Sequence, residues 1–157
     1  MPRLLDCFRD VLEWTREQFP DRGIVTGGRS MGGRAASLLE AEERGAAGLA
    51  LLNYPLVGVR ANATAAPRTG HWPQLTVPVL FVHGTRDRLL PTALFEESLP
   101  LLGGSASVTV HVVESADHGF AVPRSTGRSA AEVHREVGEA LARWVVAAVG
   151  PSAIGTV

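Results

Sequence analysis

The sequence predicts an α/β fold of three layers (α/β/α), in which helices cover both faces of a parallel sheet. Two continuous apolar runs, Gly48–Leu52 and Pro78–Gly84, have the character of strands that are buried on both faces. Helical patterns separate these runs, and strands that alternate with helices are typical of parallel sheets. The 157 residues, of which 45% are hydrophobic, suffice for one domain with a buried core. We therefore expect a single domain over residues 1–149 and a flexible tail over 150–157.

The first half of the chain begins with an amphipathic helical pattern that ends at Pro20. A short strand is expected at Gly23–Gly28, and a second helix from Met31 to about Glu43. Small residues near the start of this helix would let it lie close to a sheet, and Gly45 ends it. The first helix is predicted from residues that recur at helical spacing: Leu4, Phe8, Val11, Leu12, Thr15 and Phe19.

The second half begins with an irregular segment, residues 53–77, that is rich in Asn, Pro, Ala and Gly. A short helix is expected at Pro91–Leu99 and a further strand at Ser107–Val113. Ser129 and Glu132 have the spacing of a capping box, which opens the last helix. The buried stripe of that helix is predicted to be Val133, Val137, Leu141, Trp144 and Ala148.

Composition excludes several classes of function. The net charge of −1 and the scattered arginines give no basic patch for nucleic acid or for an acidic membrane surface. A single cysteine, Cys7, excludes an internal disulfide and a cysteine-based zinc site. Charged residues interrupt the first 14 residues, so no signal peptide is expected there. The sequence therefore predicts a cytoplasmic protein.

The stretch "TGGRSMGGRAA", Thr26–Ala36, concentrates small residues directly after an apolar run. A phosphate loop of the Walker type requires Gly-Lys-Ser/Thr at its end, but Arg34 follows Gly33, and no register gives Gly-x-Gly-x-x-Gly. Gly-x-Ser-x-Gly does fit, centred on Ser30, with an expected strand before it and a helix after it. This pattern predicts a tight turn that presents a nucleophilic serine, although a glycine-rich turn with an incidental serine is the simpler alternative.

A nucleophilic serine needs a base, and the base needs an orienting acid. Asp87 follows the strand at Pro78–Gly84, and His118 follows the strand at Ser107–Val113. Because parallel strands bring their carboxyl ends to one edge, we expect Ser30, Asp87 and His118 to meet there. The order serine, acid, histidine is the one that hydrolases with this turn use.

Other polar residues are weaker candidates for these roles. His83 is expected to be a core histidine, and His111 and His134 to be structural or exposed. His71, in the irregular segment, could line a pocket. Asp117 adjoins His118 and Glu114 is the more plausible reserve acid. Arg29 and Arg34 could hold an anionic substrate near the serine, but we favour surface or ion-pair roles for both.

Three stretches together resemble α/β hydrolases of the dienelactone-hydrolase-like branch: "GGRSMGGRAAS", "GTRD" and "DHGFAVPRSTGRS". More narrowly, they are similar to the family that includes testis-expressed protein 30 and the third subunit of the NSL histone-acetyltransferase complex. The resemblance runs from about residue 5 to residue 146.

This resemblance implies a serine hydrolase that cleaves an ester or related acyl substrate of small size. Ser30 would be the nucleophile, Asp87 the orienting acid and His118 the base, with no metal and no organic cofactor. The backbone N–H of Met31 would donate to the oxyanion, and the elbow glycines would be Gly28 and Gly32. Tyr54, in the matching stretch "LLNYPL", would wall the substrate pocket.

The resemblance also implies a partial fold, the carboxyl-terminal half of an α/β hydrolase. No early glycine-rich loop precedes Ser30 to supply a second oxyanion donor, whose loss can cost on the order of 3 kcal/mol. The strand at 24–26 would have a bare edge, through which the chain could self-associate or pair with an amino-terminal half. The alternative function is a non-catalytic interaction module or an inactive truncated hydrolase.

Overall fold

The computed structural model describes residues 1–60 and 66–150. Its centre is a four-stranded parallel sheet in the order β1-β2-β3-β4. The strands are β1 (Val25–Arg29), β2 (Gly48–Leu52), β3 (Val79–Gly84) and β4 (Val108–Val113). Because spatial order equals sequence order and all pairs are parallel, every strand ends at the same edge of the sheet.

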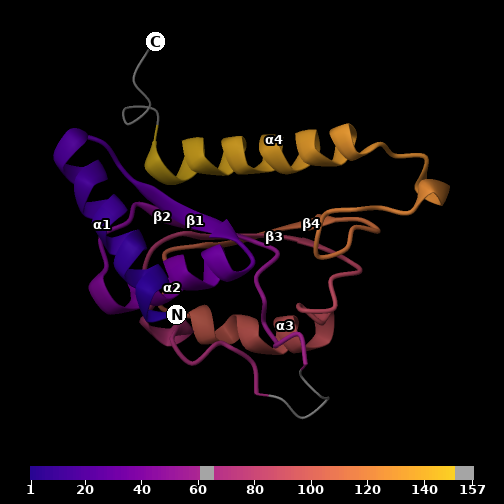
Figure 1. The fold of residues 1–157 in the computed structure, drawn as a ribbon, viewed down its shortest axis with the longest axis horizontal. Helices are drawn as coiled ribbons and strands as arrows, with labels where there is room; N and C mark the ends of the chain where they lie inside the picture. Colours follow the sequence, from indigo (N-terminus) through magenta and orange to yellow (C-terminus); the bar gives the residue numbers. More distant parts are fainter. Residues whose placement is uncertain (61–65, 151–157) are drawn as a thin grey trace.

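Helices form a layer on each side of the sheet, as predicted (Figure 1). The helix α4 (Ala130–Val149) lies across one face, and α2 (Met31–Glu43) and α3 (Thr92–Ser98) lie on the other, with α1 (Pro2–Gln18) beside α2. Short 3₁₀ turns occur at Trp72–Gln74, Leu99–Leu102 and Arg124–Thr126. The three-layer α/β/α fold is therefore confirmed. Residues 151–157 of the predicted tail 150–157, and residues 61–65 of the irregular segment, lie outside the described residues.

Two hydrophobic cores lie on opposite faces of the sheet, because neighbouring residues of a strand point to opposite sides. On the α2 and α3 side, Phe81 packs against Tyr54, Trp72 and Phe95 with ring centroids 5.0–6.3 Å apart. On the α4 side, Leu80 and Val82 of the same strand belong to the second core. Their partners there include Ala50, Val113, Val133, Val137 and Trp144. The capping box at Ser129 and Glu132 is present and starts α4 at Ala130.

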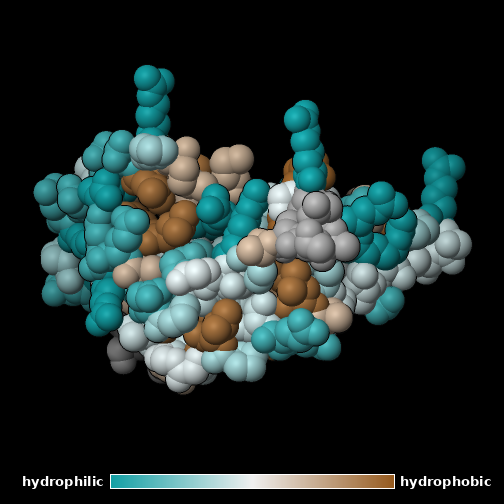
Figure 2. Space-filling view, turned by 90° about the horizontal axis from the view of Figure 1, so that it is seen from below, coloured by the Kyte–Doolittle hydropathy of each residue, from teal (hydrophilic) through white to brown (hydrophobic). Residues whose placement is uncertain are grey.

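The coverage of the sheet is less complete than the sequence predicts. Val108, Val110 and Val112 of β4 are 38–46% exposed, because no helix of the described chain covers that side of the outer strand. In α1, only Leu12 of the predicted stripe is buried, while Val11 is 58% exposed. Figure 2, which views the molecule from the α2 and α3 side, shows apolar patches separated by hydrophilic side chains.

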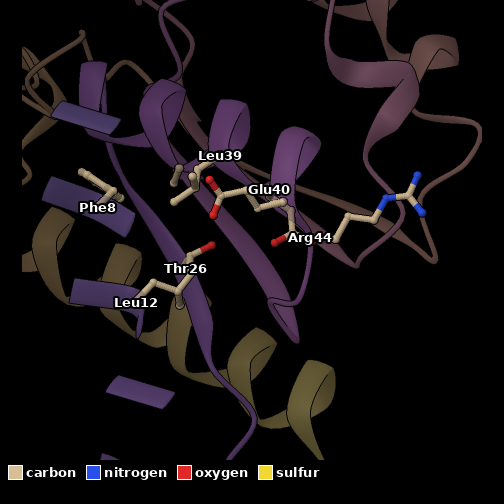
Figure 3. Close-up of a pocket in the computed structure, with 8 residues that line it drawn as sticks. Phe8, Leu12, Thr26, Leu39, Glu40 and Arg44 are labelled. Carbon is tan, nitrogen blue, oxygen red and sulfur yellow. The ribbon is translucent and has the colours of Figure 1, made fainter. Parts of the chain in front are cut away.

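A small cavity of about 20 Å³ lies where α1 packs against α2 and β1 (Figure 3). Glu40 of α2 is buried beside it, and burial raises the pKa of this carboxyl. Its two oxygens accept the backbone N–H groups of Gly45 (3.2 Å) and Ala46 (3.0 Å), which satisfies donors where α2 ends. The buried carboxyl therefore fixes the connection from α2 into β2, at the opposite end of α2 from Ser30.

Candidate active site

Ser30 occupies the turn between β1 and α2, where it is the N-cap of the helix. Its backbone angles are φ 52° and ψ −117°, in a region that L-residues rarely adopt. The Ser30 N–H donates to the carbonyl oxygen of Leu52 at 2.8 Å, which ties the turn to the end of β2. Such backbone strain costs about 1–3 kcal/mol and recurs where a side chain is presented for function.

The turn at Ser30 requires glycine on both of its sides. The resemblance names Gly28 and Gly32 as these glycines, and the structure differs at Gly32. A Cβ on Gly28 would lie 2.9 Å from the carbonyl carbon of Gly32, and a Cβ on Gly33 would lie 2.6 Å from the Gly28 oxygen. A Cβ on Gly32 itself would meet nothing within 4 Å among the described residues. The expected steric role of Gly32 is therefore corrected: the close approach of β1 and α2 constrains Gly28 and Gly33.

Asp87 and His118 reach the same edge from the loops after β3 and β4. The His118 Nδ1 lies 3.0 Å from Asp87 Oδ1 and 2.9 Å from Oδ2, and its Nε2 lies 2.8 Å from the Ser30 hydroxyl. The Asp87 side chain has no exposed surface, while the His118 side chain is 28% exposed. The three residues that the sequence predicts to meet are thus joined by hydrogen bonds in one row.

The hydrogen bonds in this row assign the tautomer of the imidazole. An ionised carboxylate only accepts hydrogen bonds, so Nδ1 of His118 carries the proton that it donates to Asp87. The neutral ring then has its lone pair on Nε2, where it accepts the Ser30 hydroxyl proton. The Asp87 carboxylate also accepts the Leu89 N–H at 2.9 Å, which fixes its orientation. The Ser30 hydroxyl is therefore hydrogen-bonded to an imidazole that the buried Asp87 carboxylate orients.

Two residues that sequence reasoning missed hold the His118 loop in place. Asn53, at the end of β2, is fully buried and donates from Nδ2 to the His118 carbonyl oxygen at 2.9 Å. At Gly84, the last residue of β3, a Cβ would lie only 2.1 Å from the Ala116 oxygen. That oxygen accepts the Arg86 N–H at 2.8 Å. Because the loop lies so close to the end of β3, only glycine fits at position 84. The glycine is visible in the sequence, but its contact with Ala116 is not.

The reserve acids have other partners. Asp117 Oδ1 accepts the N–H groups of Gly119 (2.7 Å) and Ala121 (3.0 Å), which closes the turn that presents His118. Glu114 accepts the Thr85 hydroxyl at 3.4 Å at the surface. Neither carboxylate hydrogen-bonds the His118 ring, so Asp87 is the acid that contacts it.

Among the described residues, none of the other histidines is hydrogen-bonded to Ser30. His83 is buried against Phe95, with ring centroids 5.2 Å apart, and burial lowers its pKa. His111 pairs with Glu136 at 3.1 Å, and His134 is exposed on α4. His71 Nε2 lies 2.8 Å from the hydroxyl of Ser37.

Met31 and Tyr54, predicted from the resemblance, occupy different environments. Met31 is the first residue of α2, where backbone N–H groups have no partner within the helix, and it adjoins Ser30. Tyr54 is fully buried, and its hydroxyl donates to the Arg68 carbonyl oxygen at 2.7 Å. The Tyr54 side chain is thus part of the core rather than of an exposed surface. Arg29 is exposed and Arg34 half-buried, and neither belongs to an ion pair of the described residues.

The family described as Alpha/beta hydrolase domain matches residues 1–146 of this sequence. The chain belongs to the alpha/beta hydrolase domain family. Its four parallel strands and flanking helices are a partial alpha/beta hydrolase fold. In the described part of this hydrolase domain, no three histidine, cysteine or acidic side chains lie together as metal ligands would, and no helix has the length and apolarity to cross a membrane.

Several solved structures share the fold of this alpha/beta hydrolase domain. An alpha-beta serine hydrolase homologue from Coxiella burnetii is 19% identical, with a TM-score of 0.64 over 88% of this chain and 57% of that one. A Thermus thermophilus protein is 25% identical, with a TM-score of 0.58 over 73% and 54%. The esterase domain of a Rhodothermus marinus protein is 16% identical, with a TM-score of 0.63 over 93% and 70%. The hydrolase domain thus spans little more than half the length of the first two.

Proposed function

We propose that this chain is a serine hydrolase that cleaves an ester, thioester or similar acyl substrate. One observation carries the proposal: Ser30 Oγ, His118 and Asp87 form a continuous row of hydrogen bonds, with Nε2 2.8 Å from Oγ and Nδ1 2.9 Å from the carboxylate. The strained turn at Ser30 supports it, because the strain has no evident benefit for folding.

In the first half of the reaction, Ser30 Oγ attacks the substrate carbonyl carbon while His118 Nε2 takes the hydroxyl proton. The carbonyl π electrons move to oxygen, and this oxyanion accepts a hydrogen bond from the Met31 N–H, where the positive end of the α2 dipole also favours negative charge. The tetrahedral intermediate then expels the alcohol or thiol, which takes the proton from Nε2. The acyl group remains on Ser30.

In the second half, His118 Nε2 takes a proton from water as the water oxygen attacks the acyl carbon. The new tetrahedral intermediate collapses, Ser30 Oγ leaves and recovers its proton from Nε2, and the acid is released. Asp87 holds the imidazole in the required tautomer and stabilises the imidazolium that forms in both steps. Loss of such an orienting carboxylate lowers kcat by about 10⁴-fold in hydrolases with this arrangement.

A fluorophosphonate probe tests the proposal, because it phosphonylates only an activated serine. The chain should be labelled, Ser30→Ala should abolish labelling, and Asp87→Asn should slow it by orders of magnitude. Ser125→Ala is the matched control, since Ser125 is an exposed serine in the turn Arg124–Thr126. If circular dichroism shows that the chain is folded and the probe still does not label it, the proposal is contradicted.

A second candidate function, a non-catalytic interaction module, is favoured by the open edge of β1. Among the described residues, this strand pairs with β2 alone. A groove of about 360 Å³ runs between it and α1, lined mainly by apolar residues: Cys7, Phe8, Val11, Leu12, Thr15 and Ile24–Gly27. We propose that this edge takes up a strand from an amino-terminal half of the fold, since more than 40% of the Coxiella chain and of the Thermus chain lies outside the part matched here.

Sedimentation velocity, together with the binding of an apolar dye, tests what occupies the edge of β1 in solution. If the chain is a monomer that binds the dye, and if Val11→Lys binds the dye more weakly, the groove is open to further strands. A stable dimer that Val11→Lys dissociates supports a second copy of the chain instead. Four further expectations rest on the sequence and remain part of the proposal. They are a small-molecule acyl substrate, membership of the dienelactone-hydrolase-like branch, the relation to testis-expressed protein 30 and a cytoplasmic location.

A further inference from the structure

A second hollow, of about 420 Å³, lies on the outer side of α2. The helix contributes Arg34, Leu38 and Glu42 to its wall, and the segment that precedes β3 contributes Arg68, His71 and Gln74. Two arginines from distant parts of the chain therefore line one concave surface. The proposed reaction uses none of these side chains.

Neither arginine is neutralised by the rest of the described chain. The ion pairs among the described residues include neither Arg34 nor Arg68. The Nε atom of Arg34 is buried and has no hydrogen-bond acceptor. A buried donor without an acceptor costs about 1–3 kcal/mol, and more when the group is charged. No contact among the described residues compensates for the burial of this Arg34 donor.

The backbone that carries both arginines is held by hydrogen bonds. The Arg68 N–H donates to Leu56 at 2.8 Å, and its carbonyl oxygen accepts the Tyr54 hydroxyl at 2.7 Å. The Arg34 carbonyl oxygen accepts the hydroxyl of Ser37 at 2.9 Å. A ligand that binds here would not have to order the segments that present the two guanidinium groups, which lowers the entropic cost of binding.

The floor of the hollow is polar but uncharged. His71 is hydrogen-bonded to Ser37, and burial, together with the charge of Arg34, lowers its pKa to about 4, so its ring is neutral at pH 7. Of the described residues that line the wall, Glu42 is the one acid, and it follows Arg34 by eight residues, about 12 Å along the helix. The end of the hollow near Arg34 is therefore positive.

Arg34 also lies one helical turn after Ser30, and its N–H donates to the Ser30 carbonyl oxygen at 3.1 Å. Side chains of an α-helix lean toward its amino terminus, so Arg34 covers the turn that begins at Ser30. Four residues span about 6 Å along a helix axis, so the hollow begins close to Ser30. An anion held by Arg34 would thus lie a few carbon atoms from a carbonyl held at Ser30.

We infer that Arg34 and Arg68 bind a carboxylate on the acyl chain of the substrate, so that the enzyme prefers half-esters of dicarboxylic acids to neutral esters. This inference rests on the proposed hydrolase function. A guanidinium fork matches a carboxylate with two parallel hydrogen bonds, each charge-assisted. The sequence interpretation of Arg34 as a surface or ion-pair residue is replaced by this role.

The kinetic test compares the mono-p-nitrophenyl ester of glutarate with p-nitrophenyl butyrate. The ratio of their kcat/KM values should fall at least tenfold in Arg34→Gln and in Arg68→Gln, because a charge-assisted hydrogen bond contributes about 1.5–3 kcal/mol. Arg143→Gln is the matched control: Arg143 is an exposed arginine on α4, across the sheet, and the ratio should not change. An unchanged ratio in the Arg34 and Arg68 variants overturns the inference.

The binding test needs no catalysis. Glutarate should bind the Ser30→Ala chain in calorimetry, glutaramide should not, and Arg34→Gln should abolish the glutarate signal. Labelling by the fluorophosphonate without glutarate binding overturns the carboxylate site and leaves the hydrolase. Glutarate binding without labelling overturns the hydrolase and leaves a carboxylate site in a binding module.

Discussion

The side-chain amide of Asn53 donates to the carbonyl oxygen of His118 at 2.9 Å, which joins the end of β2 directly to the loop that carries the imidazole. The Asn53 oxygen in turn lies 3.4 Å from the N–H of Gly84, at the end of β3. One buried side chain thus spans two strand ends and the histidine loop. Asn53 is a positioning residue, because it touches the backbone of His118 and not the reacting atoms.

Asn53→Ala should slow the reaction more than it weakens substrate binding. The lost hydrogen bond frees the His118 loop, so we expect kcat and the rate of fluorophosphonate labelling to fall about tenfold with little change in KM. The free energy of unfolding should fall by about 1–3 kcal/mol, since Gly84 and His118 lose a buried partner. Ser98→Ala is the control, because Ser98 is an equally buried polar residue on α3. If both variants slow labelling equally, the effect is one of stability alone.

Gly84→Ala should displace the histidine loop. A Cβ at this position would lie 2.1 Å from the Ala116 oxygen and 2.5 Å from its carbonyl carbon, and backbone atoms cannot rotate away. We expect a loss of about 1–3 kcal/mol in the free energy of unfolding and loss of labelling at Ser30. Gly138→Ala is the control, since a Cβ there meets nothing within 4 Å and a helix favours alanine by about 1 kcal/mol. Urea titration of both variants checks the signs.

Ser30→Gly and Ser30→Ala should differ in stability although both lack the nucleophile. At φ 52° and ψ −117° a Cβ is strained, whereas glycine adopts such angles freely. We expect the glycine variant to be more stable by about 1 kcal/mol in chemical denaturation, and both to be unlabelled. Equal stability of the two variants would show that the turn relaxes once the hydroxyl is gone.

His71→Gln should reduce the acid sensitivity of the fold. The folded pKa of His71 is about 4, below its ordinary value of 6.5. As the pH falls from 6.5 to 4, the unfolded chain takes up a proton that the folded chain refuses, so the free energy of unfolding falls. The native chain should lose on the order of 2 kcal/mol more than His71→Gln over this range.

The control for this measurement is His134→Gln, an exposed histidine on α4, whose stability curve should run parallel to that of the native chain. Burial raises the pKa of Glu40, which opposes the His71 effect, but Glu40 is present in both proteins and cancels in the comparison. Parallel curves for the native chain and His71→Gln would contradict the assignment of a neutral buried His71.

The elements were predictable because their signals are local. The helix from Met31 to Glu43, the strand Gly48–Leu52 and the capping box at Ser129 occur where periodicity and capping chemistry place them. The bounds of the other strands differ by one or two residues. The wrong predictions concern which residues are buried. Val110 and Val11 are exposed, because the burial of a side chain depends on which element lies opposite it.

From the amino-acid order alone one can predict which elements form, in what order, and so which strand ends carry Ser30, Asp87 and His118, because parallel strands joined by helices all end at one edge. The surroundings of these three side chains depend on how the elements pack in three dimensions. Asn53 reaches the His118 carbonyl across 65 positions, Gly84 meets Ala116, and Arg34 shares a hollow with Arg68. These contacts depend on packing between distant segments, for which periodicity and spacing carry no signal.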